Sequence, residues 1–221
     1  MSKLLCSYPR SGSSYLRFLI DKNTNYCIGT SHRTNVFDMG LTSVDAKKMK
    51  TNTIAFKTHY PQQFRLNSEV GRQKVFNGDK HTLLILIRNP YDTLRSWNKL
   101  ENFKITPQCI TDFCEDWKNF ISYYENLKGN RKRFITYEQL KMETEDSLQG
   151  VCEYLGIEMN PDFKNVNREE SIQRSASSPY QSFIGDCKVM QDHRGFFTDL
   201  QVQQIKNACE KYLVKYFSEF V

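Results

Sequence analysis

A chain of 221 residues favours a single domain, residues 1–221, and its net charge of +6 is a mild bias toward anionic ligands that is too diffuse to indicate nucleic acid. No segment approaches the roughly 18 apolar residues that a membrane helix needs, so no membrane partner is expected. The seven cysteines are scattered without a C-x-x-C pair, which argues against a disulfide framework and a structural zinc site and favours a reducing, cytoplasmic location.

The first predicted element is a short buried strand at residues 4–6, so early that no room remains for a signal peptide. A turn with Arg10, Gly12 and three serines follows, and an amphipathic helix comes directly after it. A helix N-terminus carries unpaired N–H groups and partial positive charge, and glycine lets the backbone approach a ligand. The turn is either a phosphate-binding loop or an ordinary connection with a serine cap, and these residues alone do not separate the two.

Strands and helices alternate along the rest of the chain. Apolar runs predict three further strands, at residues 53–58, 83–87 and about 133–136. Four patterns predict further helices, which begin at Pro90, residue 111, residue 146 and a cap at Thr198 or Asp199. This order predicts an α/β fold: a single domain with a mainly parallel central sheet flanked by helices.

Polar side chains follow each predicted strand where it ends. Arg10 follows the first strand, Lys57 and His59 close the second, Arg88 follows the third and Tyr137 the fourth. Ligands of parallel α/β sheets bind beyond the carboxyl ends of the strands. We therefore expect these side chains to meet at one edge of the sheet.

Four motifs lie in a fixed order along the chain. They read YPRSGSSY at residues 8–15, KTHYP at 57–61, RNPYDTLRS at 88–96 and YE at 137–138. Together they resemble the soluble sulfotransferases that use 3′-phosphoadenylyl sulfate (PAPS). The turn lacks the lysine that follows the last glycine of a kinase-type P-loop. The resemblance covers most of the chain and implies the sulfotransferase fold, which is similar to that of P-loop nucleotide kinases.

The resemblance implies an enzyme that moves a sulfonate group from PAPS to a hydroxyl or amine acceptor and releases adenosine 3′,5′-bisphosphate (PAP), with no metal. Arg10 and Lys57 would place positive charge on the leaving oxygen. His59 would be the general base, which its ordinary pKa of about 6.5 suits. The structural alternative for His59 is a hydrogen-bonded histidine in a turn. The partners implied are the nucleotide donor and a small-molecule or glycan acceptor.

The same resemblance assigns the nucleotide-binding residues. Arg88 and Ser96 would hold the 3′-phosphate, and Tyr137 would order the loop around the nucleotide. The turn that holds the 5′ end would contribute Arg10, Ser11, Gly12, Ser13, Ser14 and Tyr15.

The chain departs from the family pattern in two places. Tyr15 stands where the family often has a tryptophan that stacks on adenine. The basic grip on the 3′-phosphate near the C-terminus is missing at its usual place, where Lys188 or Arg194 are the candidate substitutes.

Other polar residues receive structural interpretations. Asp92 is expected to cap the helix after Pro90, Glu138 to be a helix-start charge, and the aromatic stripe of residues 113–120 to be core packing. The remaining histidines are treated as structural: His32, His81 and His193. Of these, His32 beside Arg33 is also a candidate for the acceptor site.

Two other functions stay open at this point: a nucleotide kinase-like enzyme, and a catalytically silent protein that binds a nucleotide or RNA. The turn without its lysine argues against the kinase. Lys57 and His59 argue against the silent protein, because binding alone needs no base. The sequence leaves the acceptor and the oligomeric state unknown.

Overall fold

The computed structural model describes residues 3–30, 52–59, 61, 81–165 and 195–218. Their strands form one five-stranded sheet in the order β2-β3-β1-β4-β5, and every neighbouring pair is parallel. The bounds are β1 (Lys3–Ser7), β2 (Cys27–Thr30), β3 (Thr53–Thr58), β4 (Thr82–Ile87) and β5 (Arg131–Thr136). The predicted α/β fold with a mainly parallel sheet is therefore confirmed.

The sequence analysis missed one strand, β2, at the edge of the sheet. Its four residues, CIGT, are too few for a periodic pattern, and Gly29 lowers its strand propensity. The strand β5 also begins two residues earlier than expected, because Arg131 and Lys132 carry no apolar signal. In both cases pairing with a neighbouring strand, β3 for β2 and β4 for β5, defines the strand more than its own sequence does.

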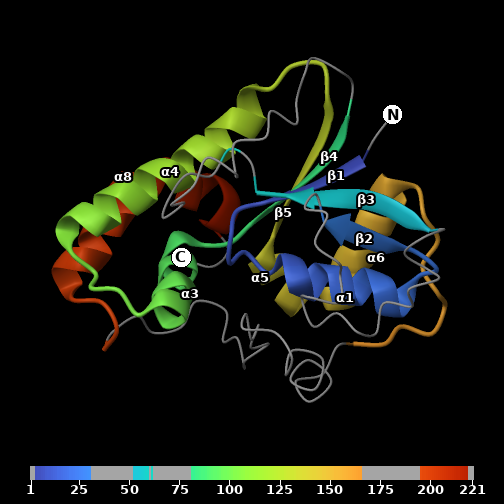
Figure 1. Ribbon diagram of the computed structural model, residues 1–221, viewed down its shortest axis with the longest axis horizontal. Coiled ribbons are helices and arrows are strands. Elements are labelled where there is room, and N and C mark those ends of the chain that lie inside the picture. Colours follow the sequence, from blue (N-terminus) through green and yellow to red (C-terminus); the bar gives the residue numbers. More distant parts are fainter. Residues whose placement is uncertain (1–2, 31–51, 60, 62–80, 166–194, 219–221) are drawn as a thin grey trace.

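Helices cover both faces of the sheet (Figure 1). One face packs against α1, α5 and α6, and the other against α4 and α8, with α3 beside them. Their bounds are α1 (Ser13–Asn23), α3 (Pro90–Glu101), α4 (Pro107–Asn126), α5 (Tyr137–Met142), α6 (Thr144–Leu155) and α8 (Asp199–Phe217). The sheet is thus buried on both faces, as the wholly buried run of β4 predicts.

Two predicted helix starts are corrected, because α4 begins at Pro107 rather than residue 111 and α6 at Thr144 rather than residue 146. No bounds were predicted for the short helix α5.

The other boundaries follow the expected chemistry. The Thr198 side chain caps α8 in a capping box with Gln201, and Gly156 ends α6 in a left-handed conformation. The aromatic stripe of α4 is core, because Phe113, Trp117 and Phe120 are at most 1% exposed. Both expectations are confirmed.

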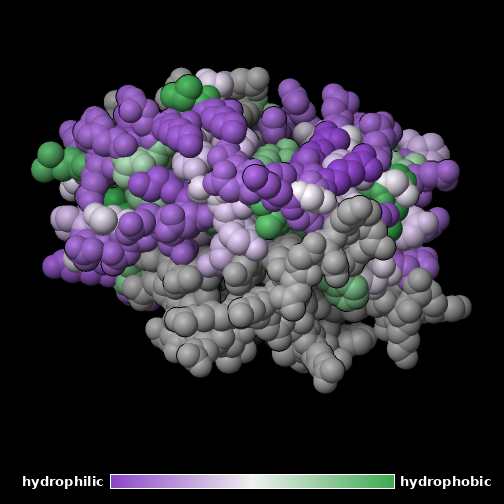
Figure 2. Space-filling model, turned by 90° about the horizontal axis from the view of Figure 1, so that it is seen from above, coloured by the Kyte–Doolittle hydropathy of each residue, from purple (hydrophilic) through white to green (hydrophobic). Residues whose placement is uncertain are grey.

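The surface seen in Figure 2 is mainly hydrophilic where residues are described. Large exposed apolar side chains, such as Leu200 on α8 and Phe56 on β3, are scattered rather than gathered in a patch. Within the described ranges, each helix is too short or too polar to span a bilayer.

The strand order creates a switch point beside β1. The chain passes from β3 on one side of β1 to β4 on the other, so that connections diverge at the carboxyl end of β1. In open parallel sheets this divergence leaves a crevice where ligands bind. The β1–α1 turn opens at this point.

Candidate functional site

The β1–α1 turn presents an uncapped helix start. Gly12 is the N-cap residue with φ of 85°, and no side chain caps the helix, so the serine cap considered above is not found. The turn is closed by a hydrogen bond from the Ser11 N–H to the Tyr8 carbonyl, 3.1 Å, and Arg10 adopts a left-handed φ of 67°. The first N–H groups of α1 consequently lack side-chain acceptors, the arrangement that binds anions.

Several buried polar atoms of this region have no hydrogen-bond partner among the described residues; one is the acceptor Oε2 of Glu138, and two others lie in the turn and at the end of β4. The latter two are the Ser11 hydroxyl and the Arg88 Nε. Burying a polar group without a partner costs free energy. The Ser11 hydroxyl and the Arg88 Nε therefore fit a ligand that supplies acceptors.

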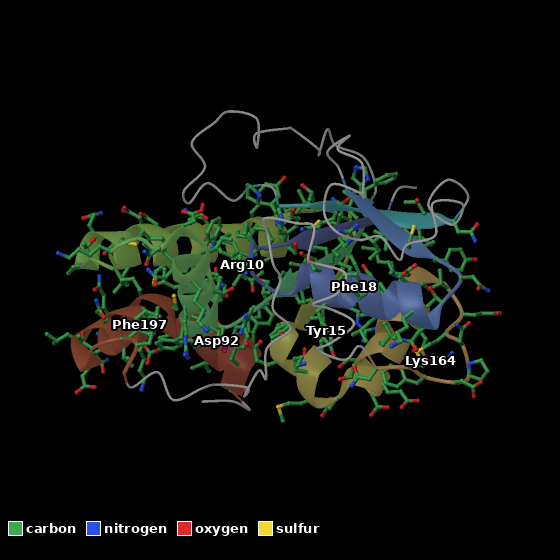
Figure 3. All side chains as sticks on the ribbon, turned by 60° about the horizontal axis from the view of Figure 1, so that its bottom comes forward. Arg10, Tyr15, Phe18, Asp92, Lys164 and Phe197 are labelled. Carbon is green, nitrogen blue, oxygen red and sulfur yellow. The ribbon has the colours of Figure 1, made fainter. Side chains whose placement is uncertain are left out.

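Arg10 follows β1 and lies between α1 and α3 (Figure 3). Arg88 follows β4 and is near enough for its charge to act on Arg10. The Arg10 Nε donates to the Ser96 hydroxyl, 3.0 Å. Burial lowers the pKa of Arg10, and the charge of Arg88 lowers it further. The Arg88 guanidinium lies 4.5 Å from the centroid of the Tyr137 ring and 3.6 Å from the Asp92 carboxylate. The structure thus brings together Arg10 of the turn and the two predicted 3′-phosphate residues, Arg88 and Ser96.

Asn89 and Glu138 form a buried clamp that the sequence analysis missed. The Glu138 carboxylate accepts from the Asn89 backbone N–H at 3.1 Å and from its side-chain amide at 2.6 Å. Burial raises the pKa of Glu138, and the donors of Asn89 oppose the shift. Glu138 does begin α5, as expected, but it is 1% exposed and holds the β4–α3 corner rather than acting as a surface charge.

The cap of α3 is Asn89, which corrects the expectation for Asp92. The Asn89 side chain accepts from the Asp92 N–H at 2.8 Å, while its amide donates to the Asp92 carboxylate at 2.9 Å. Asp92 lies in the first turn of α3, near the positive helix end, and supports the cap instead of forming it. A residue before proline is driven out of the helical region, which makes Asn89 the natural cap position.

Lys57 and His59 lie at the carboxyl end of β3, next to β1. The His59 Nδ1 donates to the Ser7 carbonyl at 2.6 Å, which places the proton of the neutral ring on Nδ1 and the lone pair on Nε2. Burial lowers the pKa of Lys57 to about 7, and the charges of Arg17 and Arg10 add to this. Lys57 therefore holds its proton less firmly than an exposed lysine.

Aromatic side chains support the turn from both sides. Tyr8 is buried beneath it and donates to the Asp116 carboxylate of α4 at 2.9 Å. Tyr15 is 3% exposed, and its ring packs edge-on against Tyr137. Tyr15 is therefore a buried residue that packs beside the turn. Tyr137 also packs against Gly12, because a Cβ there would lie 2.1 Å from its ring.

Several candidates lie outside the described residues: Lys188, Arg194, His32, Arg33 and His193. His81 is described and lies before β4, at the opposite edge of the sheet, consistent with its structural interpretation. Within the described residues, His, Cys, Asp and Glu side chains form no group of three or more that could hold a metal.

Comparisons with known proteins identify the family of this chain. A family model described as "Sulfotransferase domain" matches residues 2–220. Sulfotransferase 2A1 from Macaca fascicularis is 25% identical over 143 residues, and that from Homo sapiens is 22% identical over 192 residues. These matches cover 58% and 78% of this chain, but only 48% and 65% of the relatives, so the chain spans about half to two thirds of their length.

A solved structure shows the same fold. Mouse sulfotransferase SULT7A1, crystallised with PAP, superposes with a TM-score of 0.54 and 18% identity. The match covers 96% of this chain and 83% of the mouse chain. The described sheet and its helices therefore have the architecture of that enzyme.

The packing of Tyr137 on Gly12 makes a testable prediction. Gly12→Ala adds a Cβ that meets the ring and also strains the backbone, whereas Gly129→Ala, at φ of 80°, meets nothing within 4 Å. We expect Gly129→Ala to lower the free energy of unfolding by about 1–2 kcal/mol, the cost of a left-handed alanine, and Gly12→Ala to lower it by clearly more. Denaturant unfolding measures both, and equal losses would show that the ring yields without cost.

Proposed function

The chain belongs to the sulfotransferase domain family, and on that basis we propose that it transfers a sulfonate group from PAPS to a hydroxyl or amine acceptor. One observation carries the proposal: cations, a hydroxyl and an oriented histidine meet at the switch point of the sheet. They are Arg10, Lys57, His59, Arg88 and Ser96. Catalysis of group transfer between oxygens consists mainly of positioning and charge stabilisation, which such a set provides.

The donor fits the unsatisfied groups of the site. PAPS supplies a sulfonate on a phosphate leaving group, with a second phosphate on the 3′ oxygen. Arg88 and Ser96 would bind the 3′-phosphate, supported by the unpartnered Arg88 Nε. The Ser11 hydroxyl and the uncapped N–H groups of residues 13–15 would bind the 5′ end. Arg10, between the two, would contact the 5′-phosphate and the sulfonate, and Tyr137 would order the loop around the nucleotide.

His59 is proposed as the general base. Its hydrogen bond to the Ser7 carbonyl fixes the ring orientation and leaves Nε2 as the basic nitrogen. Nε2 would accept the proton of the acceptor as the acceptor oxygen attacks sulfur. Lys57, two residues earlier, would neutralise the charge that collects on the leaving oxygen. The acceptor is proposed to be a small molecule or a glycan.

The cellular location proposed is the cytoplasm. The six cysteines among the described residues are free thiols, five of them in the core between sheet and helices. A reducing compartment suits such a chain.

The first prediction on this function concerns recognition of the 3′-phosphate. The wild-type protein should bind PAP more tightly than adenosine 5′-monophosphate, and Arg88→Ala and Ser96→Ala should lose most of that preference. Removing a charge-assisted hydrogen bond weakens binding by about tenfold or more. Isothermal titration measures the affinities, with Arg133→Ala, in the middle of β5, as the control. Equal losses for both ligands would assign Arg88 and Ser96 to the fold alone.

The second prediction concerns the proton on Lys57. Its pKa of about 7 means that the ligand-free protein loses this proton as the pH rises above 7. A bound phosphate raises that pKa again, so binding of PAP at pH 8 should take up close to one proton, and affinity should fall as the pH rises from 7 to 9. Titration calorimetry in buffers of different ionisation enthalpy measures the uptake. Lys57→Met should abolish it, and an unchanged uptake in that variant would contradict the assignment.

The third prediction concerns His59. Removing a positioned base typically costs about 10²–10⁴-fold in rate, so His59→Ala should lower kcat by that amount and leave the Kd for PAP nearly unchanged. The loss should be smaller with a phenol of low pKa than with an alcohol, because the phenol needs less help to lose its proton. Steady-state kinetics with both acceptors test this. A kcat near the wild-type value with the alcohol would make His59 a structural residue of the turn.

A further inference from the structure

A buried arginine on α1 has no place in the motifs of the site. Arg17 is 4% exposed and lies one helical turn after Ser13. Its Nε donates to the Ile28 carbonyl of β2 at 2.9 Å. Its NH1 is buried and has no hydrogen-bond partner among the described residues.

Strand register brings Lys57 to the same side of the sheet as Arg17. Leu5 and Lys57 are directly paired in the parallel ladder, so their side chains point to the same face. Leu5 belongs to the core cluster that packs on α1. The charge of Arg17 lowers the pKa of Lys57 more than that of Arg10 does, which agrees with a position close to Lys57.

The cations of the site follow the order of the strands. Arg88 follows β4, Arg10 follows β1, Lys57 ends β3, and Arg17 is bonded to β2, the next strand along. The effects of these charges on one another follow the same order. The charge of Arg88 lowers the pKa of Arg10, and the charges of Arg10 and Arg17 lower the pKa of Lys57. A row across four adjacent strands spans roughly 14 Å at the usual strand spacing. It thus suits a ligand with anionic groups at both ends.

A structural role alone does not account for the charge of Arg17. A neutral donor would satisfy the Ile28 carbonyl, whereas a buried guanidinium costs several kcal/mol of desolvation and opposes the charge on Lys57. Burial lowers the pKa of Arg17 to about 10, and Asp21, one turn further along α1, offsets only part of the shift. An anion next to Lys57 would offset both the desolvation of the Arg17 guanidinium and its repulsion with Lys57.

We propose that Arg17 binds the 5′-sulfonate of the donor through its NH1, which has no hydrogen-bond partner among the described residues. The inference rests on the proposed function, which puts the 3′-phosphate at the Arg88 end of the row. The sulfonate then lies at the other end, beyond Arg10. Arg17 would hold the transferring group while His59 and Lys57 act on the acceptor and the leaving oxygen.

The test compares two ligands that differ only in the sulfonate. Equilibrium dissociation constants for PAPS and PAP, without acceptor, are measured for the wild type and for Arg17→Gln, which keeps an amide donor for Ile28 but loses the charge. We expect PAPS binding to weaken by at least about tenfold and PAP binding by less than about twofold. Arg17→Lys should retain part of the PAPS affinity.

A matched control is Arg133→Gln, which also loses a hydrogen bond from an arginine to a carbonyl. Arg133 lies on β5, the edge strand on the far side of the sheet from β2. This control should change neither affinity. Equal weakening of both ligands in Arg17→Gln would make Arg17 structural, and no weakening would show that it does not touch the donor; either result overturns the inference alone. A wild-type protein that binds neither ligand would overturn the proposed function, and the inference with it.

Discussion

One buried carboxylate sets the geometry on which the candidate site depends. Glu138 accepts two hydrogen bonds from Asn89, so the ends of β4 and β5 are joined directly, not only through the ladder between them. The same Asn89 caps α3 and binds Asp92, which faces Arg88. A charge-assisted contact inside the protein is strong, and a buried carboxylate without donors would be costly. The clamp therefore fixes where Arg88 can lie before any ligand arrives.

With its frame fixed in this way, the site can hold like charges close together. Within the described residues, Arg10 makes no ion pair and Arg88 makes one, with Asp92 at 3.6 Å. Burial and mutual repulsion lower the pKa of Arg10 and of Lys57. This repulsion between buried cations lowers the stability of the ligand-free protein. It favours binding of an anion, because the anion offsets the repulsion. Shifted pKa values of buried groups beside like charges are common at functional sites.

The sequence predicted which residues lie at the carboxyl ends of the strands, but it did not predict the side-chain contacts between them. Motifs placed Arg10, Lys57 and Arg88 at strand ends, and parallel strands necessarily bring those ends together. The clamp was missed because Glu138, although part of the YE motif, lies in the first turn of a helix like an ordinary acid, and nothing in the local pattern points to Asn89. Arg17 was missed for a similar reason: it lies within an apolar helical run, where a single arginine reads as a solvated side chain. Both depend on contacts between segments far apart in the sequence.

Helix direction explains why similar cations behave differently at the two edges of the sheet. At the carboxyl edge α1, α3 and α5 begin, so their positive ends add to the charge of the arginines there. At the opposite edge α6 and α4 end, and Lys3 and Lys132 donate to the carbonyls of Leu155 and Glu125 in their last turns. Carbonyls at the negative ends of these helices thus stabilise both lysines. At the carboxyl edge Asp92 faces Arg88 and Glu138 is bonded to Asn89, while Arg10 makes no ion pair among the described residues. An anionic ligand is therefore the natural counterpart of the cations gathered there.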